Sequence, residues 1–129
     1  CFLKDSVQYT NKMETLISSW RKAWKDDKMP FYYVQLVPYL YSKSTGKIVL
    51  DKETLPTFWQ AQANVGQRVK QTDFVTTTDL ADTLTNIHPW YKWEIVKRLA
   101  LLALKHDYGK KDLVASGPIF KKMKNEKNI

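Results

Sequence analysis

Two short segments rich in β-favouring residues alternate along this chain with three segments whose apolar side chains recur at helical spacing. The helical pattern covers about residues 7–25, 55–69 and 89–108, and the strand-like pattern covers 31–37 and 74–78. This alternation predicts an α/β fold, in which helices cover both faces of a parallel sheet. Two strands are too few to form a stable sheet alone, so we expect part of a three-layer αβα domain.

Local signals mark where several of these segments begin and end. Asp5 and Gln8 have the spacing of a capping box, and Pro89 is suited to the first turn of the third helix. Gly109 is expected to end that helix in the left-handed conformation, and a further strand to follow at 110–114. The third helix is expected to bury one face, made of Trp90, Trp93, Val96, Leu99, Leu102 and Ala103. Residues 39–53 are expected to form a loop, with a hairpin at 47–50 as an option.

Composition narrows the classes of function. The chain has 129 residues and a formal net charge of +8, but its only arginines are Arg21, Arg68 and Arg98. Because nucleic-acid recognition relies on arginine, this balance argues against a nucleic-acid-binding protein.

Cys1 is the one cysteine, which excludes an intrachain disulfide and a cysteine-based metal site. No apolar run is long enough to span a membrane. The chain starts without Met or a signal-peptide pattern, so we expect the gene to begin upstream.

Candidate chemistry lies in the loops that follow the two expected strands, because ligands of open α/β sheets bind beyond the carboxyl ends of the strands. The loop after the second strand holds Asp79, Asp82 and His88. A histidine there is suited to act as general base toward a serine, oriented by a nearby carboxylate. The alternative is that His88 merely caps the third helix. His106 falls on the last turn of that helix, where it would complement the helix dipole.

Short fragments of the chain occur in a recognisable order. Residues 16–21 read L-I-S-S-W-R and residues 34–36 read V-Q-L. Downstream, residues 79–80 read D-L, residues 87–89 read I-H-P and residues 98–100 read R-L-A. Together these fragments resemble the closing block of the sialate O-acetylesterases, a family of SGNH hydrolases. The resemblance implies a flavodoxin-like αβα domain, of which residues 1–112 would be the C-terminal portion and 113–129 an exit segment with a basic tail.

The resemblance also implies roles for individual residues. His88 matches the catalytic histidine of the family, and Asp79 and Asp82 match two acids of its loop, either of which is a candidate to orient His88. Many SGNH enzymes place that acid three residues before the histidine, where this chain has Thr85, so the supporting acid stays open.

Two glutamines and a tryptophan complete the candidates. Gln35 and Gln62 match recurrent family glutamines and are candidate substrate-binding residues, although Gln62 could equally be an ordinary helix-surface residue. If Gln35 is buried in its apolar run, it needs a hydrogen-bond partner. Trp59 stands where relatives often carry arginine, and core packing is its favoured role.

The family's serine nucleophile lies in a G-x-S segment that this chain lacks. The resemblance therefore implies an acetylesterase fragment that acts on acetylated sugars, O-acetylated sialic acid foremost, with the serine supplied by the N-terminal portion of the same enzyme. It implies no metal or organic cofactor and an extracytoplasmic location (secreted, periplasmic or lysosomal). The main alternative is a catalytically inactive glycan-binding or structural module.

Overall fold

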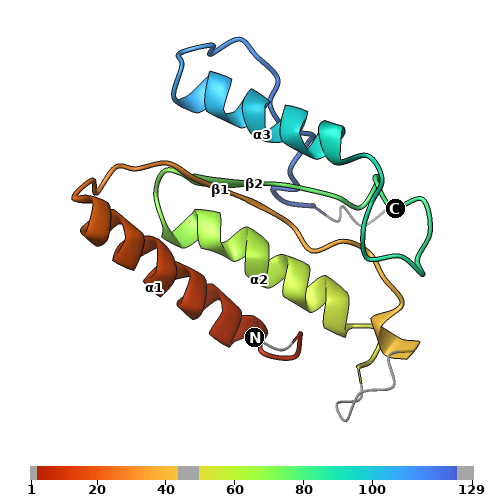
Figure 1. Ribbon diagram of the computed structural model, residues 1–129. Helices are drawn as coiled ribbons and strands as arrows, with labels where there is room; N and C mark the ends of the chain where they lie inside the picture. Colours follow the sequence, from red (N-terminus) through yellow and green to blue (C-terminus); the bar gives the residue numbers. More distant parts are fainter. Residues whose placement is uncertain (1–2, 44–49, 125–129) are drawn as a thin grey trace.

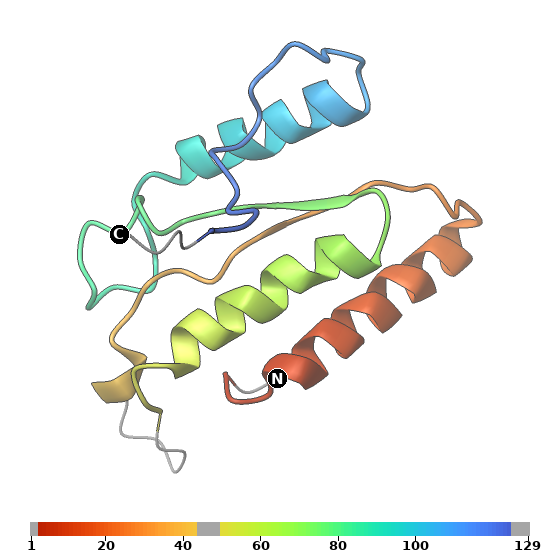
Figure 2. The same cartoon turned by 180° about the vertical axis from the view of Figure 1, so that it is seen from behind.

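The computed structural model describes residues 3–43 and 50–124. Its sheet consists of two parallel strands, β1 (Phe31–Val34) and β2 (Thr72–Val75), paired in register. Because the helix between them carries the chain back across one face of the sheet, the two strands run in the same direction. Figures 1 and 2 show a helical layer on each face of this sheet. The expectation of an α/β fold with a parallel sheet and three layers is therefore confirmed.

One helical layer consists of α1 (Ser6–Trp24) and α2 (Thr54–Arg68), which lie side by side (Figure 1), close to the predicted bounds. Ile17 of α1 and Val65 of α2 are fully buried and pack with Tyr33 of β1 in one cluster of the core. The prediction of a capping box at the start of α1 is wrong, because the side chain of Asp5 makes no capping hydrogen bond. The helix ends instead on Lys25 in the left-handed conformation, whose N–H bonds the last turn.

The other layer is α3 (Lys92–His106), and two expectations about it are wrong. It begins at Lys92, because the segment before it forms turns, one of them closed by the Asn86 side chain, which competes with helix formation. Its buried face also differs from the prediction: Leu102 is fully buried against Val75 of β2, with three partly buried neighbours, Ile95, Leu99 and Leu101. Trp90, Trp93 and Val96 are exposed instead. Helix α3 has apolar residues on two stripes, and only one stripe can face a sheet.

The remaining segments differ from expectation at the strand ends. Strand β2 begins two residues earlier than predicted and ends at Val75. Residues 110–114 form turns instead of a strand, although Gly109 does adopt the left-handed conformation with φ 70°. A single turn of 3-10 helix, Tyr41–Lys43, lies in the predicted loop, and the possible hairpin falls on residues 44–49, outside the described part. Within the described residues, no helix has the length and apolarity that crossing a membrane requires.

Candidate functional site at the carboxyl edge of the sheet

The loops that follow the two strands are bonded to each other where the strands end. The Gln35 N–H donates to the Val75 carbonyl at 2.9 Å, which extends the parallel pairing beyond the regular strands. The Thr77 hydroxyl, fully buried, donates to the Gln35 carbonyl at 3.2 Å. Further along, the Leu40 N–H donates to the Leu84 carbonyl at 2.9 Å. The loop after β1 thus supports the loop that carries the predicted catalytic histidine.

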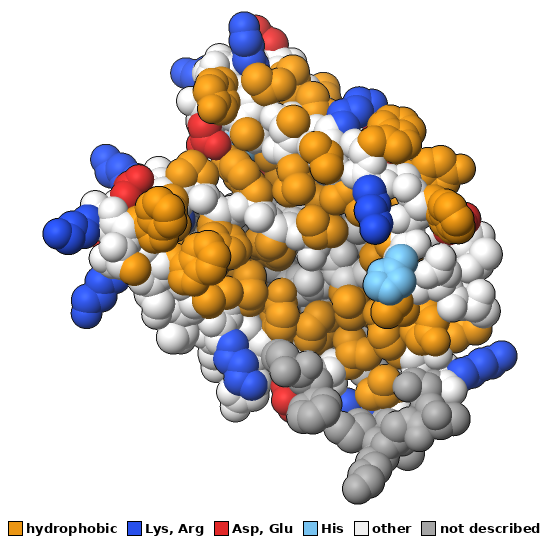
Figure 3. All heavy atoms as spheres, viewed as in Figure 1, with side chains coloured by type: hydrophobic (Ala, Val, Ile, Leu, Met, Phe, Trp, Pro, Cys, Tyr) orange, Lys and Arg blue, Asp and Glu red, His pale blue; other side chains and the backbone are white. Residues whose placement is uncertain are grey.

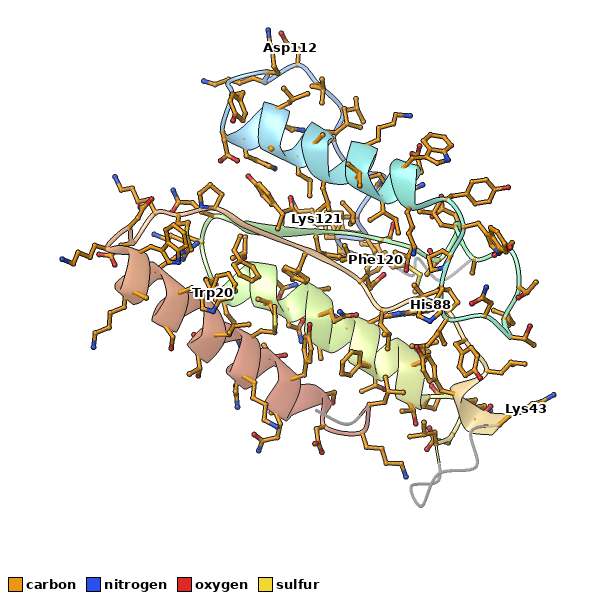
Figure 4. The ribbon with its side chains drawn as sticks, in the orientation of Figure 1. Trp20, Lys43, His88, Asp112, Phe120 and Lys121 are labelled. Atoms are coloured by element: carbon orange, nitrogen blue, oxygen red, sulfur yellow. The ribbon has the colours of Figure 1, made fainter. Side chains whose placement is uncertain are left out.

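His88 lies at this edge, in the segment that leads from β2 into α3 (Figure 4). Its backbone is fixed on both sides: the Asn86 side chain accepts the His88 N–H at 2.9 Å, and Pro89 is buried. The residue itself is exposed, and it lies outside α3, so it does not cap that helix. In the described part of the chain, no hydrogen bond or ion pair joins the His88 ring to a carboxylate.

Asp79 is engaged by a different partner. The Arg98 guanidinium of α3 holds both oxygens of the Asp79 carboxylate, with Nη1 2.8 Å from Oδ1, and also donates to the Thr76 carbonyl at 2.9 Å. This pairing lowers the pKa of Asp79 below its ordinary value. Glu94 binds Arg98 from the preceding turn of the helix. The cluster of Asp79, Arg98 and Glu94 fixes α3 to the end of β2. Asp82, the other acid of the loop, is exposed.

The two candidate substrate-binding glutamines are buried. Gln62 of α2 is 3% exposed, and its Oε1 accepts the Leu36 N–H at 2.9 Å. The indole N–H of half-buried Trp59 donates to the Leu36 carbonyl at 2.7 Å, so α2 holds this residue of the loop by both backbone groups. The Gln35 side chain, 7% exposed, donates to the Trp59 carbonyl at 3.5 Å, which is the partner that its burial requires. Gln62 is therefore not a surface residue, and both glutamines stabilise the edge.

The second histidine lies at the opposite end of α3. His106 Nε2 is 3.3 Å from the Asp73 carboxylate, and its ring stacks on Tyr32. Because Asp73 lies near the start of β2, His106 is remote from the carboxyl edge of the sheet. It occupies the last turn of the helix, as predicted.

A cavity of about 580 Å³ opens between β2, α3 and residues 114–119. Asp79 and Arg98 line one end of it, whereas His88 does not line it. The cavity therefore runs along the outer edge of β2 and is separate from the surface that displays the histidine. Among the residues that the structure describes, no three His, Cys, Asp or Glu side chains are grouped so that they could hold a metal ion.

Two residues that organise this edge, Arg98 and Thr77, have no functional role that was predicted from the sequence. Arg98 was recognised only as part of the R-L-A fragment, although its spacing of four from Glu94 is a signal for a helix-surface ion pair. Thr77 carried no signal in the sequence, because its burial depends on how the two loops pack.

Comparison with known proteins relates the chain to a protein of known structure. No protein-family model and no curated protein sequence matches the chain. Among solved structures, the chain is similar to a carbohydrate acetylesterase from Xanthomonas citri, with a TM-score of 0.77 and 28% sequence identity. The similarity covers 93% of this chain but only 26% of the acetylesterase, so the chain spans about a quarter of that protein's length. The likeness relates this chain to the carbohydrate esterases.

Proposed function

We propose that this chain is part of a serine-dependent carbohydrate O-acetylesterase of the SGNH type, in which His88 is the general base. The observation that carries the proposal is the match to a carbohydrate acetylesterase over nearly the whole chain. The position of His88 supports it, because the residue lies exposed at the carboxyl edge of a parallel sheet, where open α/β folds bind their ligands (Figure 4). The family fragments around His88 point to acetylated sialic acid as the substrate.

The chemistry assigned to His88 is acyl transfer through a serine that lies outside this chain. The imidazole takes the hydroxyl proton as the serine oxygen attacks the acetyl carbonyl. It then gives that proton to the sugar oxygen as the ester bond breaks and an acetyl-serine forms. In the second half, the imidazole takes a proton from water as the water attacks the acetyl group, and returns it to the serine oxygen as the acetyl-serine bond breaks, which releases acetate and the free serine. The donors that stabilise the oxyanion would come from the same missing portion.

One of the loop acids would orient the imidazole. Asp79 is already held by both oxygens on Arg98, which makes it better suited to fixing α3 against β2. Asp82 is exposed and lies six residues before His88 in the same loop. We therefore assign Asp82 as the candidate partner of His88, and Asp79 as a residue that positions the loop.

The N-terminal portion of the enzyme would join this chain at the free edge of β1. In the described residues β1 pairs with β2 alone, so the backbone groups along its other edge have no partner strand. Beside it, Trp20 of α1 is 51% exposed and stands edge-on to Phe31, with ring centroids 6.2 Å apart. Leu16, one turn earlier, is also exposed. Figure 3 shows hydrophobic side chains gathered over this end of α1. A further parallel strand would satisfy the edge and cover these side chains.

The test is acetate release from an O-acetylated sialoside by the purified enzyme that contains this chain, with fluorophosphonate labelling of its serine. We expect His88→Asn to abolish acetate release and to slow labelling, because both need the activated serine. The matched control is His106→Asn, which should leave both unchanged because His106 lies at the other end of α3. Equal activity of the His88→Asn and unchanged enzymes would refute the proposal. An unlabelled, inactive wild type would favour the inactive glycan-binding module. The resemblance to the sialate O-acetylesterases also leads us to propose an extracytoplasmic location.

A further inference from the structure

An exposed aromatic cluster lies immediately after His88. Trp90, Tyr91 and Trp93 are 75%, 49% and 64% exposed, although residues of this size are normally among the more buried in a protein. Tyr91 and Trp93 stand edge to face, with ring centroids 6.5 Å apart and an angle of 79° between their planes. Figure 3 shows hydrophobic side chains over this start of α3, at the upper right of the view. Helix α3 packs on the sheet through Leu102 and its neighbours, so the exposed rings are not part of the hydrophobic core.

The cluster lies within short reach of the proposed catalytic base. Trp90 follows His88 by two residues and Trp93 by five. A fully extended chain would place their Cα atoms at most about 7 and 18 Å from that of His88. Because the segment contains bends, the actual separations are shorter than these upper limits. Trp90 is therefore within reach of a sugar whose ester lies at the His88 imidazole, and Tyr91 and Trp93 lie further along the same segment.

We infer that Trp90, Tyr91 and Trp93 form a platform that binds the pyranose ring of the acetylated sugar, an inference that rests on the proposed esterase function. The face of an aromatic ring is electron-rich, and it attracts the C–H groups that line one face of a pyranose while the sugar hydroxyls stay in water. Lys92 lies between the aromatic residues and is exposed, so it supplies a cation for the carboxylate of an acidic sugar. The Xanthomonas citri acetylesterase described above also acts on carbohydrate.

A polypeptide covering α3 is the competing occupant, and Val96 distinguishes it from a sugar. Val96 lies on the next turn of the same helix and is 65% exposed, as much as Trp93. A protein surface laid along α3 would bury Val96 together with the rings. A sugar bound beside His88 would depend on the aromatic faces and not on this aliphatic side chain.

The first experiment is a titration of the ¹⁵N-labelled protein, followed through its indole N–H signals and assigned with single Trp→Phe variants. The probes are the methyl α-glycoside of N-acetylneuraminic acid and a neutral O-acetylated methyl pyranoside. We expect the Trp90 and Trp93 signals to move with at least one probe. Trp20 and Trp24 are the internal controls, since they are exposed on α1 in the opposite layer. No movement with either probe, or equal movement of all four signals, would overturn the inference.

The second experiment separates this inference from the proposed function. In the active enzyme, we expect Trp93→Ala to raise KM about tenfold with kcat unchanged, and Val96→Ala to change neither. If the enzyme is active and Trp90→Ala and Trp93→Ala leave KM unchanged, the platform is refuted while the esterase stands. If sugar moves the Trp90 and Trp93 signals but no acetate is released, the esterase assignment fails and the platform stands.

Discussion

Replacing Gln62 with leucine tests whether this residue binds substrate or stabilises the fold. Its Oε1 accepts the Leu36 N–H at 2.9 Å, and the side chain is 3% exposed. Gln62→Leu keeps the approximate volume and removes the acceptor, so the Leu36 N–H loses its partner. An unsatisfied buried donor costs about 1–3 kcal/mol. Because Leu36 is only half-buried, water can partly replace the acceptor, and we expect a loss of about 1–2 kcal/mol in the free energy of unfolding.

Urea unfolding followed by circular dichroism measures this loss. With a dependence on urea of about 2 kcal/mol per molar, the midpoint should fall by roughly 0.5–1 M without a change of slope. The control is Gln60→Leu on the same helix, where an exposed side chain bonds only to Asn64, and its effect should stay within about 0.5 kcal/mol. If both variants unfold at the same urea concentration, the structural role of Gln62 is refuted. If, in that case, the KM of the Gln62→Leu enzyme rises while that of the Gln60→Leu enzyme does not, Gln62 binds substrate.

Three further substitutions test the packing and charge around the sheet. Asp79→Asn should lower the free energy of unfolding by up to about 1 kcal/mol at pH 7, a modest value because the pair is partly exposed. The pKa of Asp79 is lowered in the folded state, so its contribution is present above the ordinary carboxyl pKa and is lost as pH falls through the folded value. Urea midpoints of the two proteins should therefore converge in strong acid, and a constant gap would contradict the pairing. Ile17→Ala, at a fully buried site, should cost about 2–5 kcal/mol in thermal or urea unfolding, and a loss below 1 kcal/mol would contradict the core assignment. Gly109→Ala should lower the free energy of unfolding by about 1–2 kcal/mol, because the φ of 70° lies in the left-handed region. The control is Gly117→Ala, which should be neutral because its φ lies outside that region and no atom lies within 4 Å of the added methyl group. Equal thermal midpoints of the two variants would contradict the left-handed turn at Gly109.

The sequence predicted those elements in which one hydrophobic pattern dominates. Helices α1 and α2 have a single apolar stripe, and both were predicted within two residues of their bounds. The face of α3 could not be predicted in this way, because Trp93 and Val96 lie on one stripe while Leu99 and Leu102 lie on another. Contacts with β2 decide between the two stripes, and periodicity within the helix carries no information about those contacts.

In the candidate site, too, local sequence predicts some features, and others depend on how the elements pack. The place of His88 follows from local order, since the residue lies in the loop after a parallel strand and before a helix. The partner of Asp79 does not follow, because Arg98 is 19 residues away and reaches it only after α3 has docked. The glutamines show an intermediate case. A polar side chain in an apolar run predicts a buried hydrogen bond for Gln35, but the identity of the acceptor depends on the packing of α2.

The hydrogen bonds at the carboxyl edge hold backbone and leave the imidazole of His88 facing outward. Leu36 is held by α2, Leu40 is bonded to Leu84, and Asn86 bonds the His88 N–H. A general base must be held in place before the reaction, because ordering it during catalysis would add to the barrier. The contacts at this edge fix the loop that carries His88, as the proposed role of a general base requires. It follows that substitutions in the supporting contacts should change stability and activity together, whereas substitution of the exposed His88 side chain should change activity alone.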